Sequence, residues 1–333
     1  MAKTILITGG AGFIGSNFIR MMLNSYKDCS VVCLDKLTYS GNMDNLSDCL
    51  NNKNFKFIKG DICDKADYKD LRPDVIVNFA AESHVDRSIL EPADFWKTNV
   101  EGTRSLLEFA KQINVELFLH ISTDEVYGSI LQGKFKEDSP TEPTSDYSKS
   151  KLEADKVALG YSKYFKVIIT RSCNNVGPYQ YPEKVIPLFI TNALEDKPLP
   201  LYGDGLNTRE WIYVLDNCEA IDFLIKRRDK IEGIFNISSE REAANVELTK
   251  MILKKLGKPE TLIKFVKDRP GHDRRYAIDC SKIKSLGWQP KHDIDSALDE
   301  TIKWYLANKD WWNKIKAKRE YTDYYKKQYG ERL

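Results

Sequence analysis

Residues 4–15 read Thr4-Ile5-Leu6-Ile7-Thr8-Gly9-Gly10-Ala11-Gly12-Phe13-Ile14-Gly15. The first four residues have the apolar, β-branched composition of a buried strand, and a helical pattern of apolar residues runs over Phe13-Leu23. Between them, Gly9 permits a tight turn, Gly12 lets the backbone approach a phosphate group, and Gly15 lets helix and strand pack closely. The stretch therefore predicts the first β-α unit of a phosphate-binding α/β fold.

Strand-like and helical segments continue to alternate after this unit. Apolar residues recur at helical spacing over Pro92-Gln112 and Ser148-Lys163. This alternation predicts a parallel sheet covered by helices on both faces, and right-handed crossovers make it a doubly wound, Rossmann-type sheet. The further expected strands are Val31-Leu34, Phe55-Ile58, Val75-Phe79, Leu117-Ile121 and Val167-Thr170.

The pattern changes after Arg171, where proline and glycine become frequent. We expect residues 1–171 to form a nucleotide-binding domain, and residues 172–310 to form mainly a smaller C-terminal ligand-binding lobe, partly interleaved with the first sheet. Residues 311–333 are aromatic and basic at helical spacing, so they are expected to pack on the body or on a partner subunit. The elements expected in the second half are helices at Leu215-Arg227, Val246-Leu256 and Ile294-Ala307 and a strand at Ile234-Ile237.

Composition excludes several classes of protein. The 333 residues carry a net charge of +2, which argues against a nucleic-acid partner. No apolar run approaches the roughly 18 residues that span a membrane. The chain enters a strand pattern directly after Met-Ala-Lys, so no signal peptide is expected. The seven cysteines are an odd number and include no C-x-x-C pair, which favours reduced thiols and a cytoplasmic location.

The second strand ends in Asp35, twenty residues beyond Gly15. A carboxylate here can accept hydrogen bonds from both hydroxyls of an adenosine ribose and would repel a 2′-phosphate. We therefore expect NAD in preference to NADP, although the adjacent Lys36 weakens the preference. Asp61 and Ile62 would lie beside the adenine, unless Asp61 only forms a turn after Gly60. Small residues against which the cofactor can lie follow the fourth strand at Ala80 and Ala81.

Tyr147 and Lys151 are four residues apart, so both side chains lie on one face of the predicted helix. A phenol titrates near 10 and serves as a base at neutral pH only when positive charge lowers its pKa. Lys151 and an oxidised nicotinamide would supply that charge. An ordinary surface pair is the alternative, but the position after the fifth strand of a nucleotide-binding fold favours catalysis.

Thr123, Asp124 and Glu125 follow the fifth strand directly. Two adjacent carboxyl groups can serve as acid and base if they hold different protonation states. Because neighbouring side chains of a strand point to opposite faces, the chain must turn at Asp124 for both to face one substrate. A solvated pair in a loop is the alternative.

The glycine motif and the Tyr147-Lys151 pair resemble the extended short-chain dehydrogenase/reductase family, and more narrowly its nucleotide-sugar 4,6-dehydratases. The resemblance covers nearly all of the chain. The acidic pair after Thr123 is its most specific element, since epimerases and decarboxylases of this fold lack it. The matching runs lie at Ala80-Ser88, Ser122-Gly128, Asn174-Lys184 and Asp268-Tyr276.

The resemblance implies a dehydration with NAD, with dTDP-glucose as the expected substrate and UDP-glucose as the main rival. Tyr147 would take the proton of the 4-hydroxyl while Thr123 bonds the 4-oxygen. Glu125 would then remove the C5 proton while neutral Asp124 protonates the departing 6-hydroxyl. Hydride return to C6 would give a 4-keto-6-deoxysugar.

The resemblance also assigns binding residues, and it implies no metal. Further contacts to the cofactor are expected from Phe13, Ile14, Leu37, Thr38, Ser83, Thr98 and Asn175. Contacts to the substrate are expected from His84, Asn174, Lys184, Val185, Pro200, Tyr202, Arg209, Asn245, Arg269 and His272.

The chain departs from the family pattern at several positions near the substrate. Val176 stands where tyrosine is expected, Ser172-Cys173 reverses the expected order, Glu210 replaces aspartate, and Asp146 and Lys149 flank Tyr147-Ser148 in place of proline and alanine. These changes leave the nucleotide base and the sugar open.

Three further expectations concern alternatives and assembly. An epimerase or decarboxylase of the same fold is the rival enzyme, and a nucleotide-sensing regulatory protein is the non-enzymatic alternative. By resemblance, the helices near Pro92-Gln112 and Ser148-Lys163 would form a four-helix bundle in a homodimer.

Overall fold

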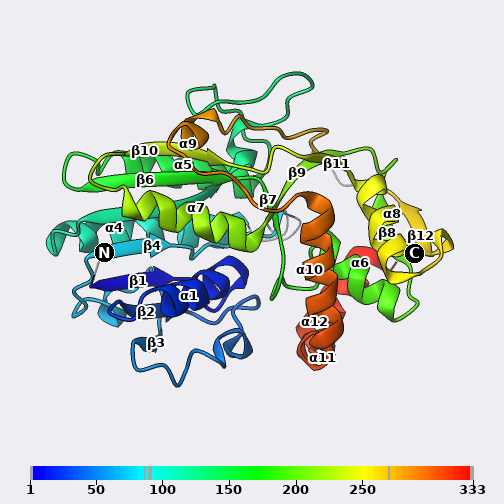
Figure 1. Ribbon diagram of the computed structural model, residues 1–333, viewed down its shortest axis with the longest axis horizontal. Helices are drawn as coiled ribbons and strands as arrows, with labels where there is room; N and C mark the ends of the chain where they lie inside the picture. The colour runs from blue at the N-terminus through cyan, green and yellow to red at the C-terminus, as the bar shows by residue number, and fades with distance from the viewer. Residues whose placement is uncertain (1–2, 86–87, 89–91, 269–270, 331–333) are drawn as a thin grey trace.

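The computed structural model describes residues 3–85, 88, 92–268 and 271–330 (Figure 1). Its centre is a seven-stranded sheet in the order β3-β2-β1-β4-β5-β6-β10, in which every pair of neighbouring strands is parallel. The predicted Rossmann-type sheet is thereby confirmed. Its strands are β1 (Thr4–Thr8), β2 (Ser30–Asp35), β3 (Phe55–Lys59), β4 (Val75–Asn78), β5 (Leu117–Thr123), β6 (Lys166–Ser172) and β10 (Gly233–Ile237).

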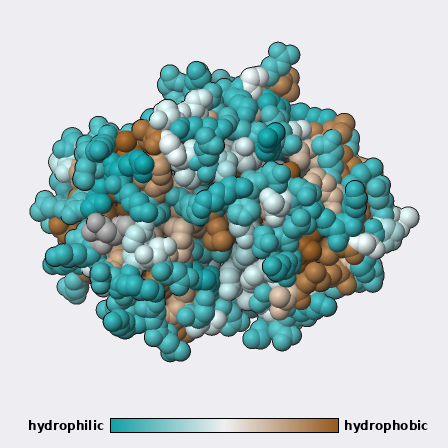
Figure 2. Space-filling view, viewed as in Figure 1, coloured by the Kyte–Doolittle hydropathy of each residue, from teal (hydrophilic) through white to brown (hydrophobic). Residues whose placement is uncertain are grey.

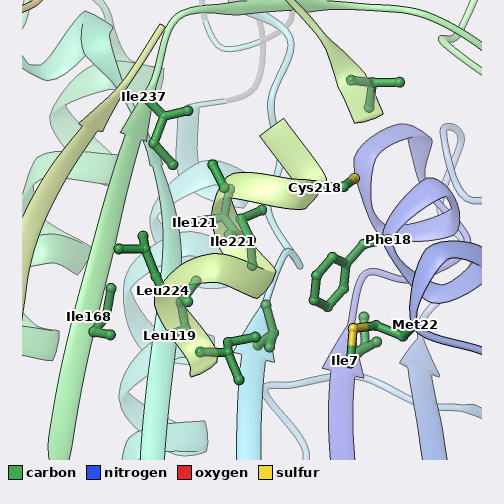
Figure 3. Packing of buried hydrophobic residues seen from close by; sticks show 14 of the residues in the cluster. Ile7, Phe18, Met22, Leu119, Ile121, Ile168, Cys218, Ile221, Leu224 and Ile237 are labelled. Carbon is green, nitrogen blue, oxygen red and sulfur yellow. The ribbon is translucent and has the colours of Figure 1, made fainter. Parts of the chain in front are cut away.

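Helices cover both faces of this sheet. α1 (Phe13–Ser25) and α7 (Val214–Lys226) lie on one face, whereas α4 (Thr103–Gln112) and α5 (Asp146–Leu159) lie on the other (Figure 1). Alternate side chains of β5 point to opposite faces of the sheet and pack against both helical layers. Leu119 and Ile121 belong to the apolar cluster around α1 and α7, and Phe118 belongs to the cluster around α4 and α5. Figure 3 shows Ile221 and Leu224 of α7 packed over the strands beside α1.

The helix expected over Pro92-Gln112 is present but irregular. It consists of α3 (Pro92–Phe95), the π-helix η3 (Trp96–Gly102) and α4. Within η3, the buried amide of Asn99 donates to Glu82 O at 3.1 Å and to Ser150 Oγ at 2.9 Å, and it accepts from Glu82 N at 2.9 Å. These tertiary bonds accompany the widened turn, a feature that apolar spacing does not reveal.

The second half of the chain is shared between the main sheet and a smaller lobe. The strand expected at Ile234-Ile237 is β10, which pairs with β6 as the last strand of the main sheet. The lobe has its own apolar cluster. Its elements are α6 (Val185–Leu194), α8 (Asn245–Leu256), α10 (Ile294–Ala307), a three-stranded sheet of β7 (Asn174–Val176), β9 (Thr208–Tyr213) and β11 (Glu242–Ala244), and a pair of β8 (Leu199–Tyr202) and β12 (Ile263–Val266).

The aromatic tail forms α11 (Lys309–Lys316) and α12 (Arg319–Tyr329), which lie against the body of the protein. Trp311 Nε1 donates to Asn45 Oδ1 at 2.8 Å, and the Tyr321 hydroxyl donates to Pro182 O at 3.1 Å. The remaining short elements are η1 (Met43–Leu46), η2 (Lys65–Asp67), η4 (Asp124–Tyr127), η5 (Glu260–Leu262) and α9 (Ser281–Ser285).

The surface seen in Figure 2 is mostly hydrophilic, with apolar side chains in small groups. Among the residues that the structure describes, no helix combines the length and apolar character needed to cross a bilayer. All seven cysteines are free thiols.

The glycine turn after β1 depends on two close approaches. Gly9 has φ +66°, and a Cβ at this position would lie 2.6 Å from Ala80 N. A Cβ at Gly15 would lie 2.5 Å from Gly9 O. Both positions therefore require glycine for space, and Gly9 requires it for conformation as well.

We predict that Gly9→Ala destabilises the fold much more than Gly133→Ala. Gly133 has a similar φ of +75° but nothing within 4 Å of its Cβ position, so its substitution meets only backbone strain. That strain costs roughly 1 kcal/mol, whereas Gly9→Ala adds a clash with backbone atoms and should cost about 3 kcal/mol or more. Urea unfolding of both variants measures the difference, and equal losses would contradict the account.

Candidate functional site

A cleft runs along the carboxyl edge of the main sheet. Parallel strands bring the segments that follow them to the same edge, so the glycine turn after β1, Asp35 at the end of β2, and Thr123 at the end of β5 all line it. Most of the predicted cofactor and catalytic residues therefore share one space. Those that line it are Gly9, Gly12, Phe13, Ile14, Gly15, Asp35, Lys36, Thr38, Asp61, Ile62, Ala80, Ala81, Ser83, Thr98, Thr123, Asp124, Glu125, Tyr147, Lys151 and Asn175.

The N-terminus of α1 has the features of a phosphate-binding site. Gly12 is the N-cap residue, and the first turn contains neither a capping side chain nor an acidic residue. A Cβ at Gly12 would meet only Gly9 O, at 3.2 Å. The N–H groups of the first turn therefore lie beside a space that a phosphate can enter, as a dinucleotide requires.

The Asp35 carboxylate is fixed by backbone donors. Ala11 N donates to Asp35 Oδ2 at 2.9 Å and Leu37 N to Asp35 Oδ1 at 2.7 Å. Burial raises the pKa of this carboxyl, and the two backbone donors oppose the rise. Leu37, a predicted cofactor contact, has φ +58° and does not line the cleft. Its backbone N–H instead holds the Asp35 carboxylate.

The charge of Lys36, which weakened the expected preference for NAD, is paired. Lys36 Nζ lies 2.8 Å from Asp61 Oδ2. Because a neighbouring carboxylate already satisfies this ammonium group, it is less available to a 2′-phosphate. The fit of the cleft to NAD thus rests on the glycine turn and on Asp35.

The chain turns directly after Thr123, as two carboxylates facing one substrate require. Asp124–Tyr127 form the 3₁₀ helix η4, which is capped by Thr123 through a bond from Glu125 N to Thr123 Oγ1 at 3.3 Å. The Thr123 hydroxyl also donates to Asp124 Oδ1 at 3.3 Å. Both Asp124 and Glu125 line the cleft.

The environment of Asp124 favours its neutral form. The side chain is buried, and no hydrogen-bond partner of Oδ2 is found within the described ranges. Burial raises the pKa of the Asp124 carboxyl well above its usual range, with further contributions from Glu125 and Glu210. Glu125 is half-buried. The two neighbouring carboxyl groups therefore differ in environment, as separate acid and base roles demand.

Tyr147 and Lys151 lie on α5, which begins in a capping box between Ser145 and Ser148. Burial, together with Glu125, raises the pKa of Tyr147, while its hydrogen bond with Thr123 opposes the rise. Without cofactor, the phenol is therefore neutral.

Lys151, the cation of the predicted pair, is held by a backbone acceptor. Lys151 Nζ donates to Ile121 O at 2.5 Å, and burial lowers the pKa of Lys151 to about 8. A base role for Tyr147 consequently needs the positive charge of both Lys151 and an oxidised nicotinamide.

The predicted substrate residues fall into two groups. Asn174 and Lys184 line the cleft, and Lys184 Nζ donates to Ser83 O at 3.1 Å. His84 is buried beside them, with Nε2 3.9 Å from Glu183 Oε1.

The other group belongs to the lobe and does not line this cleft. Arg209 is buried, donates to Asp273 O at 2.8 Å and lies 4.1 Å from the centre of the Tyr276 ring. The Tyr202 ring lies 6.1 Å from that of His272. Val185 begins α6, Pro200 lies in β8 and Asn245 begins α8, whereas Arg269 lies outside the described residues. Their roles remain predictions.

Several cleft residues were missed in the sequence. Gln180, Tyr181 and Glu183 line the cleft. They lie within the run Asn174-Lys184, whose resemblance to the family could have indicated them. Tyr39, Ser40 and Gly41 also line it, but they follow β2 in a loop without a recognisable motif.

Comparison with known proteins agrees with this geometry. The family model described as GDP-mannose 4,6 dehydratase matches residues 6–301. The low-salt glycan biosynthesis protein Agl12 of Haloferax volcanii is 50% identical over 91% of this chain and 99% of its own length. A dTDP-glucose 4,6-dehydratase of Streptomyces niveus is 45% identical over 96% of this chain and 97% of its own.

A solved structure shows the same architecture. The crystal structure of DesIV, a dTDP-glucose 4,6-dehydratase of Streptomyces venezuelae with NAD bound, has a TM-score of 0.90 and 46% identity, covering 94% of this chain and 99% of that one. The chain belongs to the nucleotide-sugar 4,6-dehydratase family, within the extended short-chain dehydrogenases/reductases.

Proposed function

We propose that the protein is an NAD-dependent hydro-lyase that converts dTDP-glucose to dTDP-4-keto-6-deoxyglucose and water. One observation carries the proposal: the turn that presents Asp124 and Glu125 opens into the same cleft as Tyr147, Lys151 and the glycine turn. The relatives named dTDP-glucose 4,6-dehydratase favour this nucleotide. In this proposal, residues 1–171 hold the cofactor and catalytic groups, and residues 172–310 mainly hold the nucleotide sugar.

The first step is oxidation at C4 of the sugar. NAD held by the glycine turn and Asp35 would supply a hydride acceptor for C4 and the positive charge of its oxidised ring. Tyr147 takes the proton of the 4-hydroxyl, and the ammonium group of Lys151 stabilises the phenolate. Thr123 donates a hydrogen bond to the 4-oxygen. A ketone at C4 results, and it acidifies the neighbouring C5–H.

The second step is the loss of water across C5 and C6. Glu125 removes the C5 proton, and Asp124 donates its proton to the departing 6-hydroxyl. The raised pKa of Asp124 favours the protonated form that this transfer requires. Hydride supplied to C6 by the reduced cofactor, together with a proton returned to C5, would complete the 6-deoxysugar.

The same acidic pair distinguishes the proposed reaction from those of rival enzymes. An epimerase or decarboxylase has no step that requires both an acid at C6 and a base at C5, so Asp124 and Glu125 disfavour it. A nucleotide-sensing regulatory protein would not need Tyr147 and Lys151 within the same cleft. UDP-glucose remains the alternative substrate, because the sequence and the cleft say least about the residues that would bind the nucleotide base.

We also propose a cytoplasmic homodimer formed through a four-helix bundle of α4 and α5 with their copies. Exposed apolar side chains near these helices support it: Trp96 in η3 is 41% exposed, Leu159 in α5 is 37% exposed, and Tyr164 just beyond α5 is 49% exposed. Their burial between two subunits would remove apolar area from water.

Turnover on a panel of glucose nucleotides tests the proposed reaction. We expect dTDP-glucose to give a ketosugar, detected by its absorbance in alkali, at a higher kcat/KM than UDP-, CDP- or GDP-glucose. A higher kcat/KM for UDP-glucose would overturn the assigned base. Absence of a ketosugar with every nucleotide would overturn the dehydratase.

Asp124→Asn should slow elimination while leaving C4 oxidation measurable. The amide cannot donate a proton to the 6-hydroxyl, so turnover should fall about 100-fold or more and reduced cofactor should accumulate in a single turnover. Stopped-flow absorbance of the reduced nicotinamide measures this. Asp229→Asn, in a surface turn outside the cleft, is the control. Equal loss of C4 oxidation in Asp124→Asn would contradict the assigned role.

A further inference from the structure

Three polar side chains that do not line the cleft form a buried set, which reaches Lys151 through His120. His120 Nε2 in β5 lies 3.4 Å from Lys151 Nζ and 3.8 Å from Asp155 Oδ1 in α5. Arg171 Nε in β6 donates to Asp155 Oδ2 at 3.0 Å. The exposed fractions of His120, Asp155 and Arg171 are 0%, 1% and 3%. A buried set of two cationic side chains, one carboxylate and an imidazole is costly unless its members are arranged to compensate one another.

The tautomer of His120 follows from its neighbours. The Thr8 hydroxyl donates to Asn78 Oδ1 at 2.6 Å, so the amide nitrogen of Asn78 faces His120 Nδ1, at 3.2 Å. Nδ1 therefore accepts, which places the proton of the neutral ring on Nε2, the atom that lies between Lys151 Nζ and Asp155 Oδ1. Burial, with a contribution from Lys151, holds the pKa of His120 well below its usual range, so the ring stays neutral.

Asp155 is the carboxylate that lies across His120 from Lys151. The two residues are four apart on α5 and share one helix face. His120 and Arg171 are the charged or titratable groups that face them from β5 and β6, while Tyr147, Asp124 and Glu125 lie on the cleft side. We infer that Asp155, which pairs directly with Arg171, supports the ammonium charge of Lys151 across the His120 ring, and that Arg171 is the positioning residue that fixes this carboxylate.

The pKa directions are consistent with this geometry. Burial lowers the pKa of Lys151 to about 8, and Asp155 opposes that decrease. Burial raises the pKa of Asp155, and the Arg171 guanidinium is the largest of the groups that oppose this rise. Without Asp155, the ammonium form of Lys151 would be lost at lower pH, and the support of the Tyr147 phenolate with it.

Arg171 extends the same set to the acidic turn. Its guanidinium carbon lies 4.7 Å from the centre of the Tyr127 ring, and Tyr127 is the last residue of η4. The Tyr127 hydroxyl donates to Asn236 Oδ1 in β10 at 2.8 Å. One buried ion pair thus links the helix that carries the oxidation residues to the turn that carries the elimination residues.

The ionisation of Lys151 tests the inference directly. NMR of cofactor-free protein with isotope-labelled lysine follows it, and Lys151→Met identifies the resonance. We expect a midpoint near 8 in the parent protein. In Asp155→Asn the midpoint should fall by about one pH unit or more, because the opposite charge on the far side of His120 is removed and water does not screen it. Asp222→Asn is the matched control, since Asp222 pairs with Lys226 at the same four-residue spacing on α7.

Asp155→Asn leaves the buried Arg171 without its counter-ion, so the double variant Asp155→Asn/Arg171→Gln is measured as well. It should also titrate below the parent protein. An unchanged Lys151 midpoint in either folded variant, or an equal decrease in Asp222→Asn, would overturn the inference.

The catalytic consequence rests on the proposed function and is measured separately. The alkaline limb of the single-turnover rate of C4 oxidation should move to lower pH in Asp155→Asn, in step with the NMR midpoint. An unmoved limb would overturn the positioning role. Failure of the parent protein to oxidise any nucleotide sugar would overturn the proposed function and leave the NMR result intact.

Discussion

Parallel pairing of the main sheet is the constraint on which the rest of the structure depends. Because its strands run in one direction, each strand delivers the segment that follows it to the same edge. Strand direction alone therefore brings Gly12, Asp35 and Asp124 to one edge, although they are distant in the chain. The register of β5 between β4 and β6 then fixes where Thr123 ends the strand and the acidic turn begins.

Burial at this edge gives chemically similar groups different properties. Asp124 is 3% exposed and Glu125 is half-buried, so burial acts more strongly on the first carboxyl. Lys151 is buried as well, and its pKa moves in the opposite direction because burial disfavours every charged form. The removal of water therefore favours the neutral form of Asp124 and brings the pKa of Lys151 closer to neutral pH. Neighbouring charges also shift each of these pKa values.

Much of this arrangement could be predicted from the sequence because its signals are local. A strand followed by spaced glycines, a carboxylate at the end of the next strand, and a tyrosine and lysine one helical turn apart each identify themselves within a few residues. The helix expected at Ile294-Ala307 has those bounds in the structure, since the Asp293 N-cap and the apolar spacing mark it clearly. The need for a turn at Asp124 also followed from strand geometry alone.

What could not be predicted depends on contacts between distant segments. The placement of β10 in the main sheet requires knowledge of its pairing with β6, and the π-helix around Asn99 depends on Glu82 and Ser150. The support of Lys151 joins residues from β5, α5 and β6, and neither His120 nor Asp155 belongs to a recognisable motif.

The central claim is that oxidation, elimination and hydride return take place in one cleft without release of the cofactor. NMR of the product formed from substrate deuterated at C4 tests this most directly. The account predicts that the deuterium is found at C6 of the 6-deoxysugar. Deuterium lost to solvent, or retained at C4, would contradict it.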